Sequence, residues 1–542
     1  MNHWAPILDA AKAARSDFKR ACENPLETQE RLLRRLLAAN AQTEFGRRHD
    51  FSGIKTVEDF RSRVPVRTYE QMKPWIERAT AGIDGVLTSD RPIAIEETGG
   101  SGGGCKMILR TAAGLRSFRN GILPWLGDLA ERRPAAFGGA LYVAMSPVAR
   151  QKRWSAAGIP IGSLGDAAYL GHDLQAPFID VLAVPPSVGE LTDIAAWRFL
   201  TLLHLLRSAD LTFISVFSPT FLIGLIEALP GLAEGLIAAI HDGGADTPRD
   251  PARARLVARA LARSVFAAEE VWSRLSAISA WADGASAVYA DRLRGIFANV
   301  DLQPKGLMAT EAVVSLPWGE APGAAPALTS TFLEFIGDDG CSRLCHELRD
   351  GDEYGVVITT SDGLYRYDLG DRVRCVDSVG DMPRLAFVGR GGATSDLVGE
   401  KLAEPFVASV LLRIGRPACL IAMPSPRPCY ELLVEASSES FAAAIAHTVD
   451  QNLNVNPQYA YARALGQLGA VRGRAVSDLV TAFNRACTEA GMRLGDVKPP
   501  TLVANPIIAT ALLAPNSNDA ASIPGAAFAQ TGFGASALLE AT

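Results

Sequence analysis

The sequence lacks the features that mark secreted and membrane-spanning chains. Asn2, Asp9 and Lys12 interrupt any apolar start, so we expect no signal peptide. The longest uncharged run, residues 211–226, is short for a bilayer and contains Pro219. We therefore expect a cytoplasmic protein that makes no use of a membrane.

The sequence also lacks a disulfide framework. Its eight cysteines are scattered without regular spacing, which is typical of reduced thiols inside the cell. Cys341, Cys345 and His346 stand close together, but no second ligand pair follows at zinc-like spacing. The pattern favours neither a small secreted scaffold nor a structural zinc site.

An excess of positive charge is missing as well. The net charge is −6, and the basic runs are short, so we expect no nucleic-acid partner. What the chain does have is length and apolar content: 542 residues, 48% of them hydrophobic. That is enough for two domains with their own cores.

Helical and strand-like patterns alternate along the chain, which predicts an α/β architecture. Residues 55–90 hold two short helical patterns, broken by Pro65 and Pro74. The remaining expected helices are 5–45, 112–132, 193–208 and 251–282, and the expected strands are 140–146, 180–184 and 211–217, the last followed by a helix with Ser218 as N-cap.

The later part of the chain changes character. Short strands separated by Gly and Asp turns over 328–375 predict an antiparallel sheet or distorted barrel. The turn-rich stretch 381–392 predicts a junction, followed by a small α+β unit with helices near 403–414, 440–453 and 477–490. The final residues, rich in Ala, Ser and Gly, predict a flexible tail over 513–542.

A glycine-rich run over residues 98–106 is the first signal of chemistry. It contains Thr98, Ser101 and Lys106 and lies between apolar runs at 93–95 and 107–109. Glycine-rich backbone between strands folds sharply and brings N–H groups close to an anion. With its hydroxyls and its lysine, this composition suits a polyphosphate.

Several known motifs compete for this run. Cys105 before Lys106 and Met107 after it exclude a Walker A loop. Cys105 also stands where a dinucleotide fingerprint needs its last glycine. Residues 99–103 match the nucleophile elbow Gly-x-Ser-x-Gly, which would make Ser101 a hydrolase nucleophile, and a flexible linker is the remaining alternative.

Three further signals follow in order along the chain. They are Gly306-Leu307-Met308-Ala309-Thr310-Glu311, then Gly363 to Asp371, and finally the pair formed by 389–401 and 496–500. Together with the glycine run they resemble the adenylate-forming superfamily, and more narrowly the GH3 family of acyl-acid amidosynthetases, which has many bacterial members. The likeness covers most of residues 20–505, and 359–371 is its most specific part; 64–70 and 459–469 also look like the family.

The resemblance implies a fold and a reaction. It implies a large N-terminal adenylation domain over 1–388, with mixed sheets, flanking helices and a β-barrel-like part. A hinge at 389–400 and a small mobile α+β C-terminal domain over 401–512 follow. ATP and Mg²⁺ would adenylate a carboxylic acid and release pyrophosphate, and the amine of an amino acid would then take the acyl group. The small domain would rotate between the two steps.

The resemblance also assigns roles to residues. Glu311 would bind Mg²⁺ through its carboxylate, and Thr310 would lie beside the α-phosphate or the substrate carboxylate. Asp371 would accept hydrogen bonds from the ribose, Arg390 would contact ribose or phosphate, and Lys498 would stabilise the transition state. The phosphates would be held by Thr98, Gly99, Ser101, Gly102 and Lys106.

This sequence departs from the family pattern at three positions. Glu97 precedes Thr98 where the family has a second hydroxyl, and Gly100 replaces a central Thr. Leu307 stands where related enzymes place an aromatic residue that stacks on adenine. An adenylating enzyme with coenzyme A as acceptor, and a degenerate homologue that binds nucleotide or acyl ligand without turnover, are therefore alternatives. The partners implied are small molecules, and the sequence does not identify the acid or the amine.

Overall fold

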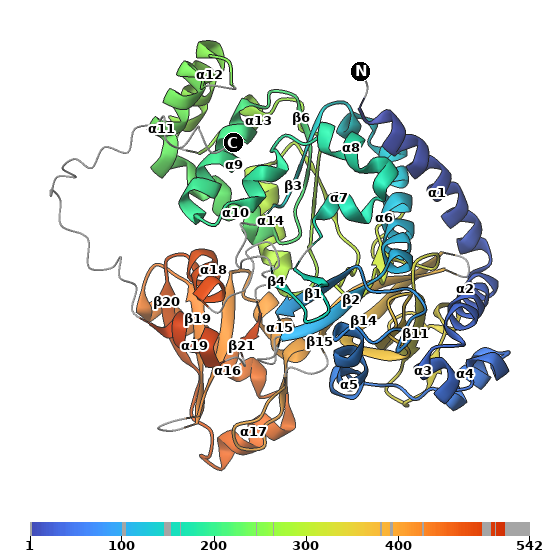
Figure 1. Cartoon of the computed structure of the whole chain (residues 1–542). Helices are drawn as coiled ribbons and strands as arrows, with labels where there is room; N and C mark the ends of the chain where they lie inside the picture. Colours follow the sequence, from blue (N-terminus) through green and yellow to red (C-terminus); the bar gives the residue numbers. More distant parts are fainter. Residues whose placement is uncertain are drawn as a thin grey trace.

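The computed structural model describes residues 3–99, 105–145, 153–162, 164–244, 247–263, 265–379, 382–390, 394–424, 428–489, 500–503 and 506–514. Figure 1 shows a large body followed by a smaller unit, coloured orange to red. This is the predicted α/β class, with a large N-terminal part and a small α+β C-terminal part.

The chain opens with helices that wrap one side of the large body. They are α1 (Ala5–Glu23), α2 (Pro25–Asn40), α3 (Glu44–Arg48), η1 (Phe51–Gly53), α4 (Val57–Arg63) and α5 (Tyr69–Thr80). This confirms the helical prediction for 5–45. The first of them lies along α6 (Ala112–Arg132), the predicted helix that occupies the centre of the body (Figure 1).

The prediction that Pro74 breaks its helix is wrong, because α5 continues through it. Because Pro74 has no N–H, the Glu70 carbonyl loses its helical donor. Both residues are exposed, so water can donate to that carbonyl instead. Met72, Ile76 and Ala79 are buried on the opposite face. Burial of that face outweighs one missing hydrogen bond.

A parallel four-stranded sheet forms the middle of the large body. Its strands run in the order β3 (Ala140–Val143), β6 (Leu211–Ser215), β7 (Ala277–Ala280), β8 (Asp301–Pro304). The sheet is preceded by η2 (Pro134–Phe137). The crossover segments are α7 (Asp166–Tyr169), α8 (His172–Asp180), η3 (Pro186–Glu190), α9 (Ile194–Arg207), α10 (Pro219–Glu227), α11 (Leu229–Asp242), α12 (Pro251–Leu261), α13 (Ala268–Val271), η4 (Gly284–Ser286) and α14 (Ala287–Ile296). Helices on both sides bury the strands, as parallel sheets require.

Two predicted elements in this region are wrong. Residues 180–184 are not a strand, because the chain touches β3 only through a bridge between Leu141 and Leu182, and two prolines that cannot donate follow at 185–186. Residues 277–280, predicted helical from their Ala-rich surroundings, form β7. All four are buried, since they lie in the interior of the sheet, and that burial overrides helix propensity.

The glycine run joins the strands of a hairpin. β1 (Ala94–Gly99) pairs antiparallel with β2 (Cys105–Arg110), and β5 (Pro160–Ile161) and β4 (Arg153–Trp154) extend the sheet. In the hairpin register Thr98 lies opposite Lys106 and Gly99 opposite Cys105. Residues 100–104 lie outside the described part of the chain.

A five-stranded antiparallel sheet confirms the prediction for 328–375. Its order is β12 (Ser342–Arg343), β11 (Phe332–Ile336), β13 (Glu353–Thr359), β14 (Tyr367–Val379), β15 (Met382–Arg390). The turn-rich reading of 381–392 is wrong for 382–390, which form β15. Pro383 is tolerated there because β15 is the edge strand. Short pieces β9 (Ser315–Leu316), β10 (Ala325–Pro326) and η5 (Cys345–Glu347) complete this region.

The C-terminal unit is a second small α/β layer structure. Its sheet has the order β20 (Arg472–Val476), β19 (Cys429–Glu435), β18 (Ala418–Met423), β21 (Leu502–Val503), and each face packs its own apolar cluster. The predicted helices are confirmed as α15 (Glu404–Leu412), α16 (Glu439–Leu453) and α18 (Leu479–Glu489), accompanied by α17 (Pro457–Ala464), α19 (Pro506–Leu513) and the strand pair β16 (Thr394–Ser395) and β17 (Leu402–Ala403). The predicted tail lies almost entirely outside the described residues.

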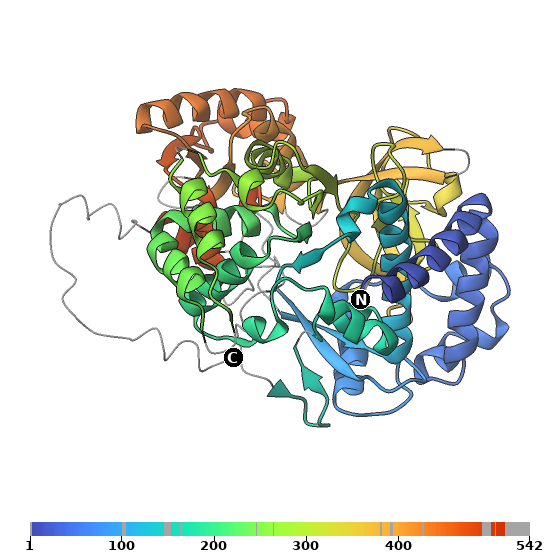
Figure 2. The same cartoon turned by 90° about the horizontal axis from the view of Figure 1, so that it is seen from above.

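The small unit contacts the large body through α15, which packs against β15 and η4, and through α18, which packs against α10. Figure 2 shows this orange unit against the green part of the large body. Val480 of α18 is buried in the apolar cluster of the large body. Arg292 of α14 donates to Glu227 of α10, and its other nitrogen lies 3.6 Å from Glu435 of β19. Beside the packing of α15, the contact therefore includes an apolar side chain and a guanidinium shared by two carboxylates.

No single described helix is long and apolar enough to cross a membrane. The pair α10 and α11 reaches that length and composition only when the two are joined across a 67° bend.

The contact between α1 and α6 yields a stability prediction. A Cβ on Gly127 would lie 2.3 Å from the Ala11 carbonyl oxygen. This is a backbone atom, so it cannot move away as the end of a flexible side chain could. We expect Gly127→Ala to lower the free energy of unfolding by about 1–3 kcal/mol. Urea denaturation measures this.

The matched control is Gly231→Ala, in α11, where nothing lies within 4 Å of the added Cβ. It should be neutral or slightly stabilising, because alanine favours helix. Equal effects of the two substitutions would contradict the close approach.

Candidate functional site

One buried guanidinium ties together the segments that carry the predicted site. Arg110, the last residue of β2, is fully buried and donates from Nε to Glu96 of β1 at 2.9 Å. It donates from Nη1 to Asp362 at 2.9 Å and from Nη2 to the backbone carbonyl of Thr310. The glycine hairpin, the Thr310 loop and the turn after β13 are thereby fixed to one another.

The electrostatics of this cluster keep Arg110 charged. Burial acts to lower the pKa of Arg110, but Asp362 and Glu96 outweigh it and hold the pKa above its ordinary value. Asp362 also accepts from the backbone N–H of Thr111 at 2.7 Å and from its hydroxyl at 2.9 Å. Thr111 in turn caps α6, so the cluster positions that helix as well.

The Thr310–Glu311 motif occupies the tip of a tight turn after β8. Met308 bridges to Val313, and the N–H of Ala309 donates to the Ala312 carbonyl at 2.9 Å. Thr310 at the tip is half-buried. The two ends of the turn are joined by a hydrogen bond from the Leu307 N–H to the Ser315 hydroxyl at 2.9 Å.

Glu311 is a buried carboxylate with unused acceptors. The side chain belongs to a residue that is only 5% exposed, yet it makes no hydrogen bond or ion pair with any residue that the structure describes. Its carboxylate therefore has acceptors that no described donor uses, and these are open to a cation. Its oxygens are hard ligands of the kind that Mg²⁺ prefers, so the residue fits a magnesium ligand.

Asp371 and Arg390 are brought together by the β14–β15 ladder. The two residues are direct partners in the antiparallel register, at the end of the hairpin next to the small unit. Asp371 is 2% exposed. Sequence reasoning placed both at one nucleotide site, and the backbone register agrees with their being neighbours.

The motif 363–371, the most specific part of the resemblance, is largely a structural element. The Tyr365 hydroxyl donates to the Leu87 carbonyl at 2.8 Å. Arg366, with φ of 45°, donates to Glu334 at 2.9 Å and to the Val64 carbonyl at 2.9 Å. These contacts join the N-terminal helices to the five-stranded sheet, and Asp371 is carried at the end of the element they fix.

Lys106 lies on the inner side of the glycine hairpin. Its ammonium donates to the Tyr367 hydroxyl at 3.0 Å and lies 5.5 Å from the Tyr69 ring centroid. These weak partners leave its positive charge without a carboxylate in the described structure. For Thr98 and Gly99 only the backbone is described, as part of the β1–β2 pairing. The described residues do not include Ser101, Gly102 and Lys498.

Leu307 gives no flat surface to a nucleotide base. It is 2% exposed and belongs to the apolar core of the large body. The aromatic side chains near the C-terminal edge of the sheet come from elsewhere: Phe217 stacks with Trp281 at 6.1 Å between ring centroids, and Trp281 meets Phe387 edge-on at 5.1 Å. Beside them, burial raises the pKa of Asp283 to about 6.

Sequence reasoning missed Arg110, Asp283 and Lys305. Lys305 follows β8 and directly precedes the Gly306 motif, and burial lowers its pKa to about 8. Arg110 ends the apolar run after the glycines. None of the three carries a motif. For Lys305 the available signal is that a charged residue follows a buried strand at the carboxyl edge of a parallel sheet, where ligands of open α/β sheets bind.

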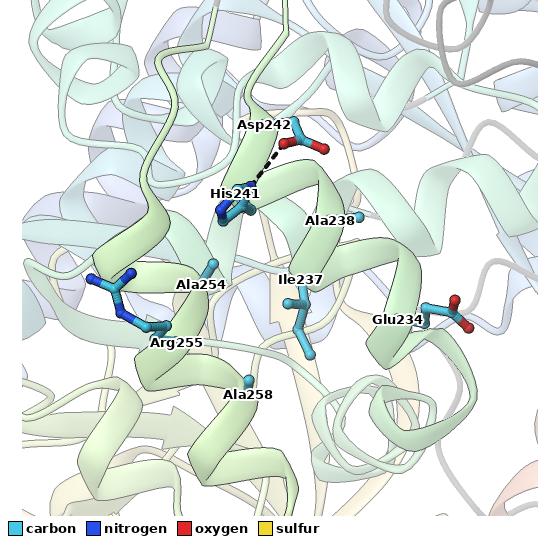
Figure 3. Close-up of a pocket in the computed structure, with 8 residues that line it drawn as sticks. All are labelled: Glu234, Ile237, Ala238, His241, Asp242, Ala254, Arg255 and Ala258. Atoms are coloured by element: carbon cyan, nitrogen blue, oxygen red, sulfur yellow. Dashed lines mark hydrogen bonds and ion pairs between the residues drawn. The ribbon is translucent and has the colours of Figure 1, made fainter.

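A surface groove lies apart from this cluster. It measures about 420 Å³ and runs between α11 and α12, where His241 and Asp242 are hydrogen-bonded at 2.8 Å (Figure 3). None of the predicted site residues lines it. The lining residues are Glu234, Ile237, Ala238, His241, Asp242, Ala254, Arg255 and Ala258.

Comparison with protein families gives two adjoining matches. Residues 14–302 match the GH3 family N-terminal domain, and residues 325–390 match the GH3 family central domain. The first match alone covers more than half of the chain.

Curated relatives and solved structures agree with these matches. The probable indole-3-acetic acid-amido synthetase GH3.4 of Oryza sativa is 25% identical over 433 residues, covering 71% of this chain and 68% of the relative. The indole-3-acetic acid-amido synthetase GH3.2 of Arabidopsis thaliana is 23% identical over 445 residues, covering 70% and 77%. The GH3.15 acyl acid amido synthetase structure superposes with a TM-score of 0.81 at 19% identity, covering 92% of this chain and 96% of that chain. A 2-hydroxyisobutyryl-CoA ligase in the postadenylation state gives 0.54 at 13% identity, covering 90% of each.

The Arg110 cluster yields a second prediction. Replacing Arg110 with Met leaves Glu96 and Asp362 buried without their cation, and breaking such a pair costs about 3–5 kcal/mol. We expect Arg110→Met to lower the free energy of unfolding by that amount, as measured by urea denaturation.

The control is Arg343→Met, because the ion pair between Arg343 and Asp339 is at the surface. This substitution should leave the unfolding midpoint unchanged. A loss below about 1 kcal/mol for Arg110→Met would contradict the structural role assigned to the cluster.

Proposed function

Because the chain belongs to the GH3 family, we propose that it is an ATP-dependent acyl-acid amido synthetase. It would join a carboxylic acid to an amine, the amine of an amino acid being the first candidate, with ATP converted to AMP and pyrophosphate. The relatives named above are amido synthetases, and the match to this chain covers most of their length. This supports the reaction class. The acid in the names of these relatives does not by itself identify the acid that this chain uses.

The single observation that carries the proposal is Glu311. It is a buried carboxylate with no described partner, at the tip of a turn that Arg110 fixes to the glycine hairpin. Mg²⁺ bound there would offset the charge of the triphosphate and of the acid. Thr310, next to it and half-buried, supplies a hydroxyl for the α-phosphate or for the substrate carboxylate.

The remaining nucleotide contacts follow the same geometry. Asp371 would accept the ribose hydroxyls, and Arg390, opposite it in the ladder, would contact ribose or phosphate. The phosphates would meet the backbone of Gly99 and Gly102, the hydroxyls of Thr98 and Ser101, and the ammonium of Lys106, which the described structure ties only to tyrosine. The missing hydroxyls at 97 and 100 leave fewer donors there than the family pattern has.

The chemistry balances in two steps. A carboxylate oxygen of the acid attacks the α-phosphorus, the bond to the bridging oxygen of pyrophosphate breaks, and an acyl-AMP mixed anhydride forms. The neutral amine then attacks the acyl carbon, the carbon–oxygen bond to AMP breaks, and the amine loses a proton as the amide forms. Lys498 would stabilise the charge that develops on the α-phosphate in the first step.

The second step would need the small domain, residues 401–512, to turn about a hinge at 389–400. Such a rotation would separate Arg292 from Glu435 and withdraw Val480 from the large body. Gly389 lies close to this pivot, where an added Cβ would be 2.8 Å from Pro405 of α15. A domain that exchanges positions during turnover would break and remake such contacts in each cycle.

The direct test has two readouts. A panel of carboxylic acids is assayed for acid-dependent exchange of pyrophosphate into ATP, and each active acid is then incubated with amino acids or with coenzyme A. AMP with an amide of the expected mass supports the proposal, and a thioester assigns the coenzyme A alternative. Folded protein that binds ATP but supports no exchange would identify a homologue without turnover.

Glu311 gives the sharpest variant. We expect Glu311→Gln to slow acid-dependent exchange by about 10²-fold or more, because an amide cannot neutralise a divalent cation. It should also raise the Mg²⁺ concentration for half-maximal rate. The control is Glu58→Gln, an exposed glutamate, which should leave both values unchanged. Wild-type magnesium dependence in Glu311→Gln would remove this residue from the site.

Lys498 is tested separately from Glu311. We expect Lys498→Ala to slow adenylation by about 10²-fold while transfer from pre-formed acyl-AMP to the amine stays within a few fold, because its charge acts at the α-phosphate. Lys55→Ala, at an exposed position, is the control. Adenylation that is unchanged by Lys498→Ala would exclude the role.

A further inference from the structure

Lys305 is a buried cation without an anion. Its residue is 8% exposed, and its ammonium donates to the Ser215 hydroxyl at 2.9 Å and lies 4.7 Å from the centroid of the Trp125 ring. No carboxylate of a described residue lies within ion-pair distance of it; the one charge that bears on it is Asp166 at the start of α7. A buried charge with so little compensation is unfavourable unless a ligand completes it.

The lysine occupies the edge of the sheet where ligands bind. Its N–H donates to the Ala280 carbonyl at 2.9 Å, so it extends β8 past the end of β7. From there the side chain reaches over β7 to Ser215, the last residue of β6, across two strand spacings of about 4.8 Å each. It therefore lies over the carboxyl end of the sheet, where α/β proteins bind their ligands.

Unsatisfied polar groups lie on the same face. Ser215, Ser279 and Gln303 are aligned in register across β6, β7 and β8, and Lys305 follows Gln303 by two residues. The Ser279 hydroxyl and the Gln303 amide nitrogen are buried and without a hydrogen-bond partner. Around this row the surface is apolar, formed by Trp125 of α6 and the core of the large body.

Two other described cations near the site, Arg110 and Lys106, are placed differently. Arg110 is saturated by Glu96, Asp362 and the Thr310 carbonyl. Lys106 is held at the hairpin by Tyr367. Lys305 differs from both because it stands in apolar surroundings and begins the segment that ends at Glu311.

We propose that Lys305 is the residue that receives the carboxylate of the acid substrate, holding it at the carboxyl edge of the sheet for attack on ATP. The assignment rests on the proposed function for the reaction and on the described contacts for the residue. A single ammonium in apolar surroundings matches an acid with an apolar body and one negative charge. A triphosphate would need more donors and more exposure than this position has.

The test separates acid binding from adenylation. Indole-3-acetate, phenylacetate and benzoate are each titrated by calorimetry into the full-length protein, alongside the matching primary amides, which lack the charge. For any acid that wild-type protein binds in preference to its amide, Lys305→Met should weaken binding at least tenfold. Lys55→Met, at an exposed lysine, is the control and should bind as wild type does.

The titration of Lys305 supplies a readout that a structural role would not move. The pKa of the free protein's Lys305 is near 8, so wild-type affinity for the acid should fall as pH rises through 8 and Lys305→Met should show no such fall. Asp166 is the charged group whose electrostatic effect on Lys305 is resolved, and it acts to raise the pKa of Lys305. Acid binding should therefore take up protons near pH 8.

The pKa of Lys305 also predicts whether Lys305→Met raises or lowers the stability of the protein. Burial lowers the pKa of Lys305 from 10.5 to about 8, so its contribution to stability is fully present above pH 10.5 and is lost as pH falls through 8. Lys305→Met should therefore raise Tm at pH 7, and the gain should shrink toward pH 10. A lower Tm together with unchanged acid affinity would assign Lys305 a structural role and overturn the proposal.

Kinetics then distinguish the two claims. In acid-dependent exchange, Lys305→Met should raise KM for the acid at least tenfold and leave KM for ATP within twofold. A raised KM for ATP with unchanged acid affinity would place a phosphate there instead and overturn the assignment. Carboxylate-dependent binding without any exchange would contradict the proposed function and leave the assignment supported, whereas no carboxylate-dependent binding in wild type would overturn the assignment itself.

Discussion

The structure depends on the Arg110 guanidinium. It bonds Glu96 of the glycine hairpin, the carbonyl of Thr310 two hundred residues later, and Asp362 beyond that. Each partner lies on a segment that carries part of the proposed site, and Asp362 also fixes the start of α6 through Thr111. In a buried, low-dielectric setting such a pair is strong only when every donor and acceptor is used. Here the cluster is well connected, so the segments hold one relative position.

The charges of the site divide into two kinds. Arg110 is neutralised by protein carboxylates and therefore supports structure. Glu311 and Lys305 are buried residues, and in the described part of the chain no oppositely charged side chain contacts either of them. Proteins tolerate such groups where a ligand completes them. A cation at Glu311 and a carboxylate at Lys305 would both be provided by the reactants of an acyl-adenylating enzyme, which makes the two residues a matched pair at opposite ends of one segment.

The sequence predicted those parts that local pattern controls. Amphipathic spacing located α6, α9 and α16, and the Gly306 and Gly363 motifs located Glu311 and Asp371. It failed where tertiary burial decides: Ala-rich β7 is a strand because it is interior to a sheet, α5 passes through Pro74 because the lost bond faces water, and β15 tolerates Pro383 at an edge. Arg110 and Lys305 were missed for a related reason. An isolated charged residue after an apolar run has no local signature, and its role becomes clear only from partners that the fold brings to it from other segments.

The most direct test of the account follows the oxygen atoms. The acid substrate is labelled with ¹⁸O in both carboxylate oxygens and converted with ATP and an amine, and the AMP and phosphate products are analysed by mass spectrometry. The account predicts one ¹⁸O atom in AMP for each amide formed, because the carboxylate attacks the α-phosphorus and leaves an oxygen there. Label in inorganic phosphate, with ADP as the nucleotide product, would contradict it.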